Sequence, residues 1–156
     1  IGAGVPPAGL AHKTEVIRKG LSLHAGLLDK KGAKASFNIL AALGGLEIAA
    51  LAGLIIGAAS MRLAVMVDGF ISTAAYAAAY HMVPAVRDYC FFSHGSAEAG
   101  HLKALAALQE KPLLDLGMRV GEGTGAALGL LMLEAAANTY NSMATFQSAG
   151  VSGAES

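Results

Sequence analysis

The amino-acid sequence predicts an α/β fold in which helices cover a parallel β-sheet. Two short segments, 62–70 and 87–94, each contain an apolar run that leads into polar or glycine residues, as expected for fully buried parallel strands. A helical pattern follows each run, over 71–82 and over 96–108. The order strand, helix, strand, helix is typical of a parallel sheet with right-handed crossover connections.

The chain before this alternation is predicted to be mostly helical. Residues 1–9 are rich in glycine and proline, and the two adjacent prolines argue against both a helix and a central strand, so a loop is expected. Apolar residues at helical spacing predict a half-exposed helix over 10–28. A solvated turn over 29–34 then leads to a short helix, a glycine pair and a longer buried helix within 36–59.

The carboxyl ends of the predicted strands define a candidate binding edge. A third strand or extended segment is expected over 111–120, followed by a helix from about 124 to 140. The three strands lead into Asp68-Gly69, into the polar segment 93–96 and into the glycine-rich segment 121–124. Ligands of open parallel sheets bind beyond the carboxyl ends of the strands, so a site is expected there.

Composition limits the classes of partner. At 156 residues the chain is long enough for one domain with a core. Its charged residues make up only 14%, against about 25% in typical soluble domains, which indicates that a partner chain or further sequence covers apolar surface. The 11 basic and 11 acidic side chains balance, without a basic cluster, so binding to nucleic acid is not expected.

Several other classes of protein are also disfavoured. Cys90 lies in an apolar run typical of a buried, reduced thiol in a cytosolic protein, and no secretory signal is evident. Residues 40–60 have the length of a membrane span, but Glu47 and many small residues favour a buried helix, which leaves a membrane hairpin as the weaker alternative. His94 and His101 lack a third ligand at metal-binding spacing, so no metal site is predicted.

The segment 121–126, GEGTGA, places a carboxylate between two glycines at the start of a helix. Its glycines are one residue short of the spacing in a dinucleotide fingerprint. Glu122 therefore has two interpretations. In the first, its charge interacts with the helix dipole and stabilises the helix by about 0.3–1 kcal/mol. In the second, it has a raised pKa in an apolar pocket and acts as a general base.

Two further side chains near the candidate edge, Lys13 and Asp68, also have two interpretations each, and a third, Ser96, has one. Lys13 is either a solvated lysine in a first helical turn or a ligand for a phosphate or carboxylate. Asp68 either orients a ligand or caps the helix that follows it. Ser96 is expected to be a helix N-cap, with Glu98 in the first turn.

Five segments, taken together, resemble a known enzyme family. They are GGLEIAALAG, VMVDGFISTAA, PAVRDYCFFSHGSAEAGH, PLLDLGMRVGEGTGAALGLLMLEAA and MATFQSAGV. In this order they are similar to the carboxyl-terminal half of the nicotinate-nucleotide:dimethylbenzimidazole phosphoribosyltransferases. The resemblance implies a cytoplasmic homodimer without a cofactor, built from a Rossmann-like parallel sheet flanked by helices and a small helical domain. It also implies transfer of phosphoribose from nicotinate mononucleotide to 5,6-dimethylbenzimidazole, in assembly of the lower ligand of cobalamin.

The same resemblance assigns roles to individual residues. Glu122 matches the family's general base, which removes a proton from the benzimidazole. Lys13 matches a lysine that contacts the nucleotide, Ser96 a serine that lines the product site, and the aromatic ring in the DGF motif is expected to wall the pocket. The residues expected to bind substrate are Lys13, Ser96, Val120, Gly121, Asp68 and Phe70.

The resemblance covers only part of the family's length. The family's amino-terminal half, with a second active-site glutamate and much of the benzimidazole pocket, has no counterpart in this sequence. Residues 1–151 are therefore expected to be the carboxyl-terminal part of a phosphoribosyltransferase domain, a truncated part of a larger domain, with 152–156 as a frayed tail. A fragment that binds a nucleotide or an aromatic base without chemistry is the alternative.

Overall fold

The computed structural model describes residues 7–96, 98–118 and 122–151, and within these ranges the strands form a parallel sheet in the order β1-β2-β3. The strands are β1 (Val65–Val67), β2 (Cys90–His94) and β3 (Pro112–Leu114). Val65 pairs with Cys90 and Phe92 with Pro112, so β2 is central. The predicted fold class, a parallel sheet flanked by helices, is confirmed.

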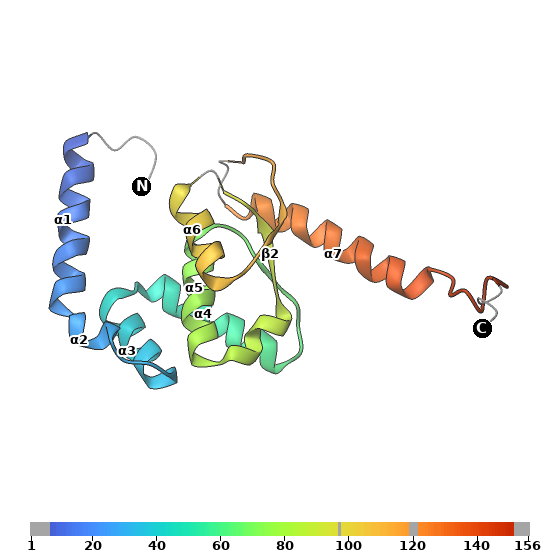
Figure 1. Cartoon of the computed structure of the whole chain (residues 1–156), viewed down its shortest axis with the longest axis horizontal. Helices are drawn as coiled ribbons and strands as arrows, with labels where there is room; N and C mark the ends of the chain where they lie inside the picture. Colours follow the sequence, from blue (N-terminus) through green and yellow to red (C-terminus); the bar gives the residue numbers. More distant parts are fainter. Residues whose placement is uncertain (1–6, 97, 119–121, 152–156) are drawn as a thin grey trace, which may run out of the picture.

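Helices flank the sheet on both sides. Figure 1 shows β2 between α6 and α7, with α1 at one end of the molecule and α7 extending from the other. The α7 helix packs on β2 and β1, while α5 packs on β1, α4 and α6. The helices are α1 (Pro7–Leu23), α2 (Ala25–Leu28), α3 (Ala33–Leu43), α4 (Leu46–Ser60), α5 (Phe70–Met82), the 3₁₀ helix η1 (Pro84–Tyr89), α6 (Ala99–Leu108) and α7 (Thr124–Ser142).

The core lies between the sheet and the helices α4, α5 and α6. Tyr76 of α5 is fully buried and meets Phe92 of β2 edge to face, with 4.8 Å between ring centroids. Ala75 and Ala79 beside it have no exposed surface, so α5 packs closely against its neighbours. The buried core residues are Ala52, Ile55, Val67, Ala75, Tyr76, Ala79, Val86, Phe92 and Leu105.

Several predicted element boundaries need correction. Residues 7–9 are not a loop, because α1 begins at Pro7. Proline suits the first position of a helix, since its φ is already helical and an N–H at that position would make no hydrogen bond within the helix. Residues 87–89 are not a strand, because they belong to η1, and β2 begins at Cys90. The predicted strand over 62–70 narrows to three residues, Val65–Val67.

The predicted burial of two helices was wrong within the described chain. The helix expected over 10–28 is interrupted at His24, and residues 10–19 and 21–23 of α1 are exposed, with Ile17 at 61%. In the helix α4, expected to be buried, only Ala52 and Ile55 are buried, while Leu46 is 90% exposed. Both helices therefore present apolar surface that this part of the chain does not cover.

The segment 40–60 is not one continuous helix. It divides between α3, which ends at Leu43, and α4, which begins at Leu46, at the predicted glycine pair. Across the ranges that the structure describes, no helix is both long enough and apolar enough to span a membrane.

Candidate active site

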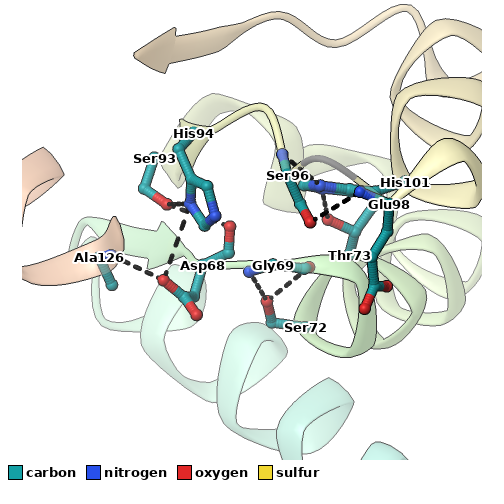
Figure 2. A network of polar contacts seen from close by, with 10 residues as sticks. All are labelled: Asp68, Gly69, Ser72, Thr73, Ser93, His94, Ser96, Glu98, His101 and Ala126. Atoms are coloured by element: carbon teal, nitrogen blue, oxygen red, sulfur yellow. Dashed lines mark hydrogen bonds and ion pairs between the residues drawn. The ribbon is translucent and has the colours of Figure 1, made fainter. Parts of the chain in front are cut away.

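The start of α7 is anchored on Asp68, which follows β1. The Ala126 backbone N–H donates to Asp68 Oδ1 at 2.8 Å (Figure 2). The first N–H groups of a helix have no partner within the helix and carry partial positive charge, so a carboxylate stabilises them. The expectation that Asp68 caps the helix that follows it was wrong. That helix, α5, has Gly69 as its N-cap, and the Gly69 N–H donates to Ser72 Oγ at 2.9 Å.

His94, the last residue of β2, lies next to Asp68. It is 3% exposed, and its Nδ1 lies 3.1 Å from Ser93 Oγ and 3.9 Å from Asp68 Oδ1. The Ser93 hydroxyl donates its one proton to the Asp68 carbonyl oxygen at 3.0 Å. Ser93 Oγ must then accept from His94, which places a proton on His94 Nδ1.

His101 of α6 holds the next position along the same edge. The Ser96 N–H donates to His101 Nδ1 at 3.1 Å, so the ring proton is on Nε2, which donates to Thr73 Oγ1 at 3.0 Å. Burial lowers the pKa of His101, and the nearby His94 lowers it further. His101 is therefore neutral at neutral pH and ties α6 to α5.

Two glycines let α7 approach the sheet closely. A Cβ added at Gly125 would overlap the His94 ring and lie 2.9 Å from Asp68 Oδ1. A Cβ added at Gly129 would lie 2.7 Å from Met66 Sδ and 3.1 Å from Ser93 Cβ. Both glycines are buried, so the beginning of α7 sits directly on the ends of β1 and β2.

Glu122 lies in the turn that leads into α7. Its φ of 64° is in the left-handed region, as is the φ of 82° at Gly123, the N-cap of α7. A left-handed conformation costs a residue with a Cβ about 1–2 kcal/mol, and such strain is concentrated at functional sites. Glu122 is exposed and precedes the N-cap, so it lies outside the first helical turn.

The remaining predicted site residues are only partly brought together. Phe70, the first residue of α5, lies over Gly100 and 6.2 Å from the His101 ring, between centroids. Ser96 is not the N-cap that was expected: α6 begins at Ala99 with Glu98 as N-cap, and the Glu98 N–H donates to Ser96 Oγ at 3.2 Å. Lys13 is exposed on α1, away from this edge (Figure 1).

Two predicted residues, Val120 and Gly121, lie outside the described residues. Reasoning from sequence also missed part of the site. His94 and His101 were weighed only as metal ligands, and within the described ranges no group of three or more His, Cys, Asp or Glu side chains is placed to hold a metal. The signal that could have found His94 is the convergence of strand ends, since His94 ends the central strand.

Comparison with known proteins then identifies the family. A family model described as Phosphoribosyltransferase matches residues 1–151. The chain belongs to this phosphoribosyltransferase family. Membership confirms the resemblance that the ordered sequence segments indicated.

Individual relatives agree with the family match. A curated phosphoribosyltransferase from Oleidesulfovibrio alaskensis, named for nicotinate nucleotide and dimethylbenzimidazole, is 59% identical over 150 residues, which cover 96% of this chain and 41% of the relative. Its counterpart in Solidesulfovibrio magneticus is 56% identical over 97% of this chain and 42% of the relative. This chain therefore spans about two fifths of the length of the curated family members that it matches.

A solved structure shows the same fold. The crystal structure of CobT from Thermus thermophilus superposes with a TM-score of 0.82 at 41% sequence identity. The match covers 97% of this chain and 43% of the CobT chain.

Proposed function

We propose that this chain carries the catalytic base of a phosphoribosyltransferase acting on nicotinate mononucleotide and 5,6-dimethylbenzimidazole. The products are α-ribazole 5′-phosphate and nicotinate, used in assembling the lower ligand of cobalamin. The names of the relatives support the reaction. The observation that carries the proposal is the position of Glu122, in a left-handed turn that opens α7 where β1 and β2 end.

In the proposed mechanism, Glu122 removes the proton from one benzimidazole nitrogen while the other nitrogen attacks C1′ of the ribose. The bond from C1′ to the pyridine nitrogen breaks, its electron pair leaves with nicotinate, and the configuration at C1′ inverts. An azole becomes cationic on attack unless a base takes its proton, so the carboxylate lowers the barrier. The ribosyl centre also develops positive charge, which a nearby carboxylate stabilises.

The substrate-binding roles belong to the same proposal. Phe70 and Ser96 lie beside His101 at the carboxyl edge of the sheet, where Phe70 would wall the pocket and Ser96 would face the product. Lys13 would contact the nucleotide phosphate, and the backbone at Val120 and Gly121 would approach the ribose. Because Lys13 lies on α1, away from this edge, its role requires contacts that only the assembled protein supplies.

The proposed assembly is a cytoplasmic homodimer in which residues 1–151 form the carboxyl-terminal part of a longer phosphoribosyltransferase domain. The expected frayed tail, 152–156, lies outside the described residues. The exposed apolar residues on α1 and α7 support the assembly, because such surface needs a covering partner or segment. The thiol of Cys90, without a partner for a disulfide, fits a reducing compartment.

A Glu122→Gln variant tests the catalytic role. The amide keeps the shape of the side chain but cannot accept the proton, so turnover should fall by about 10²–10⁴-fold. Binding of nicotinate mononucleotide, measured by calorimetry, should persist. Near-normal turnover in this variant would remove the role given to Glu122.

A second candidate function rests on the length of the match. Because the chain covers 41% of the Oleidesulfovibrio alaskensis relative, it could act as a binding fragment without chemistry. The same calorimetry separates the two proposals: saturable binding without product, even after the chain is joined to the portion of that relative it does not match, would favour the fragment.

A further inference from the structure

We infer that Asp68 is a positioning residue that holds Glu122 in its working conformation by anchoring the first turn of α7, with Ser93 and His94 fixing the aspartate. This inference rests on the proposed function of Glu122. It differs from the substrate contact expected for Asp68, because it gives the carboxylate a role that acts through the start of α7.

The conformation of Glu122 needs external support. A residue with a Cβ leaves the left-handed region unless its surroundings restrain it. Gly123 follows with its own positive φ, and the first hydrogen bond of α7 runs from the Ala127 N–H to the Gly123 carbonyl oxygen at 2.9 Å. Where α7 begins and which way it points therefore decide where the Glu122 carboxylate lies.

Asp68 supplies that restraint from a different part of the chain. Its carboxylate accepts the Ala126 N–H at 2.8 Å, across 58 residues of sequence. Ala126 belongs to the first turn of α7, four residues after Glu122, so this bond fixes the helix start relative to the end of β1. The positive end of the helix and the ionised aspartate attract each other, which strengthens the bond beyond that of a neutral pair.

The aspartate is itself held on two sides. Ser93 donates to its carbonyl oxygen at 3.0 Å, and His94 Nδ1, whose proton goes to Ser93 Oγ, lies 3.9 Å from Asp68 Oδ1. Gly125 packs so tightly on His94 and Asp68 that α7 cannot approach more closely. Figure 2 shows Asp68 between His94 and Ala126, with Ser93 beside them, so three elements meet at one carboxylate.

The test compares Asp68→Ala with Asp68→Asn in the chain joined to the portion of the Oleidesulfovibrio alaskensis relative that it does not match. Alanine removes the acceptor, so kcat should fall about 100-fold, as a misplaced catalytic group would cause, with KM for nicotinate mononucleotide nearly unchanged. Asparagine keeps Oδ1 and should restore most of kcat. Asp68→Ser serves as a second truncation if the alanine variant does not fold, because the serine side chain is too short to reach the Ala126 N–H.

Ser72→Ala is the matched control. It removes the acceptor of the Gly69 N–H at the same edge, and so weakens the start of α5 without touching α7. Its kcat should stay close to that of the parent. A comparable loss of kcat in Ser72→Ala would show that general loosening of this edge, and not the anchor on α7, explains the effect, and would overturn the inference.

Amide hydrogen exchange at Ala126 supplies a readout that does not need activity. Exchange should accelerate in Asp68→Ala and remain slow in Asp68→Asn. Unchanged exchange in the alanine variant, or an increase in KM with kcat preserved, would overturn the inference. If the parent forms no product, the proposed reaction fails while the exchange measurement still decides whether Asp68 holds α7.

Discussion

At the scale of single residues, the candidate site depends on how closely α7 approaches the strands. Gly125 is buried against His94 and Asp68, and it is the third glycine of the motif GEGTGA. In the sequence it belongs to a glycine pattern that is one residue short of a dinucleotide fingerprint. In the structure its missing Cβ makes room for an imidazole ring, which explains glycine at this position without a ligand.

Replacing Gly125 by alanine should destabilise the protein by about 1–3 kcal/mol, because the new methyl group overlaps the His94 ring and forces backbone or side-chain shifts. Urea denaturation monitored by circular dichroism measures the loss. Gly53→Ala in α4, where an added Cβ meets nothing within 4 Å, is the matched control and should stabilise by about 0.5–1 kcal/mol. Equal stability of the two variants would contradict the packing described for α7.

Residue types and strand ends predicted where the site lies, but not which groups meet. Asp68 was correctly placed at a strand end, yet its partner is a helix 58 residues later in the chain and not the helix beside it. The spacing of residues along the sequence cannot reveal such a partner, since the contact depends on the side of the sheet against which α7 packs. The pairing of His94 and His101, with ring centroids 6.2 Å apart, was missed for the same reason.

At the scale of elements, a partly buried polar cluster ties α5 and η1 to the residues that follow α6. The Tyr76 hydroxyl donates to Glu110 Oε1 at 2.6 Å, and Arg87 Nε lies 3.0 Å from the same oxygen. Arg87 also donates to the Gln109 carbonyl oxygen at 2.9 Å. Burial, and then the bond to Glu110, raise the pKa of Tyr76 well above its usual value, while burial raises the pKa of Cys90 to about 11.

Removing the Glu110 side chain should therefore lower the free energy of unfolding more than removing the Tyr76 hydroxyl. Glu110→Ala leaves the buried Tyr76 hydroxyl without its acceptor, so the free energy of unfolding should fall by about 1–3 kcal/mol. Tyr76→Phe removes the donor and should cost about 1 kcal/mol. In a double-mutant cycle the combined loss should be smaller than the sum of the two. Strict additivity would contradict the described bond.

Element types were largely predictable, because apolar periodicity and the alternation of strands and helices are local signals. The boundaries of the elements and the burial of the helices were less predictable. Pro7 was predicted to lie in a loop, but proline is tolerated at the first position of a helix. Arg87 was predicted to lie in a strand, but it belongs to η1, from which its guanidinium reaches Glu110. Whether α1 and α4 are covered depends on which elements pack against them, and the periodicity within one helix cannot identify those elements.

At the scale of the whole molecule, the described chain leaves apolar residues exposed at both ends. On α1 these include Val16 at 55% and Ile17 at 61%, and on α7 they include Leu130 at 52% and Leu131 at 62%. A composition with only 14% charged residues agrees with this surface. The proposed homodimer and longer domain would bury it.

The 156-residue chain should therefore self-associate, as light scattering after size-exclusion chromatography would detect. Ile17→Glu and Leu131→Glu place a charge on α1 and α7 respectively, and the variant on the helix that forms the contact should weaken association by tenfold or more, about 1.4 kcal/mol. Gln147→Glu, an exposed polar position, is the control. A parent that stays monomeric over the accessible concentrations would contradict the proposed homodimer.

The most direct test is mass-detected product formation from nicotinate mononucleotide and dimethylbenzimidazole. The parent and Glu122→Gln are compared, each as the 156-residue chain and each joined to the portion of the Oleidesulfovibrio alaskensis relative that it does not match. We expect α-ribazole 5′-phosphate from the joined parent, and about 10²–10⁴-fold less from its Glu122→Gln variant. Near-equal product from both joined proteins, or none from a folded joined parent, would contradict the proposed role of Glu122.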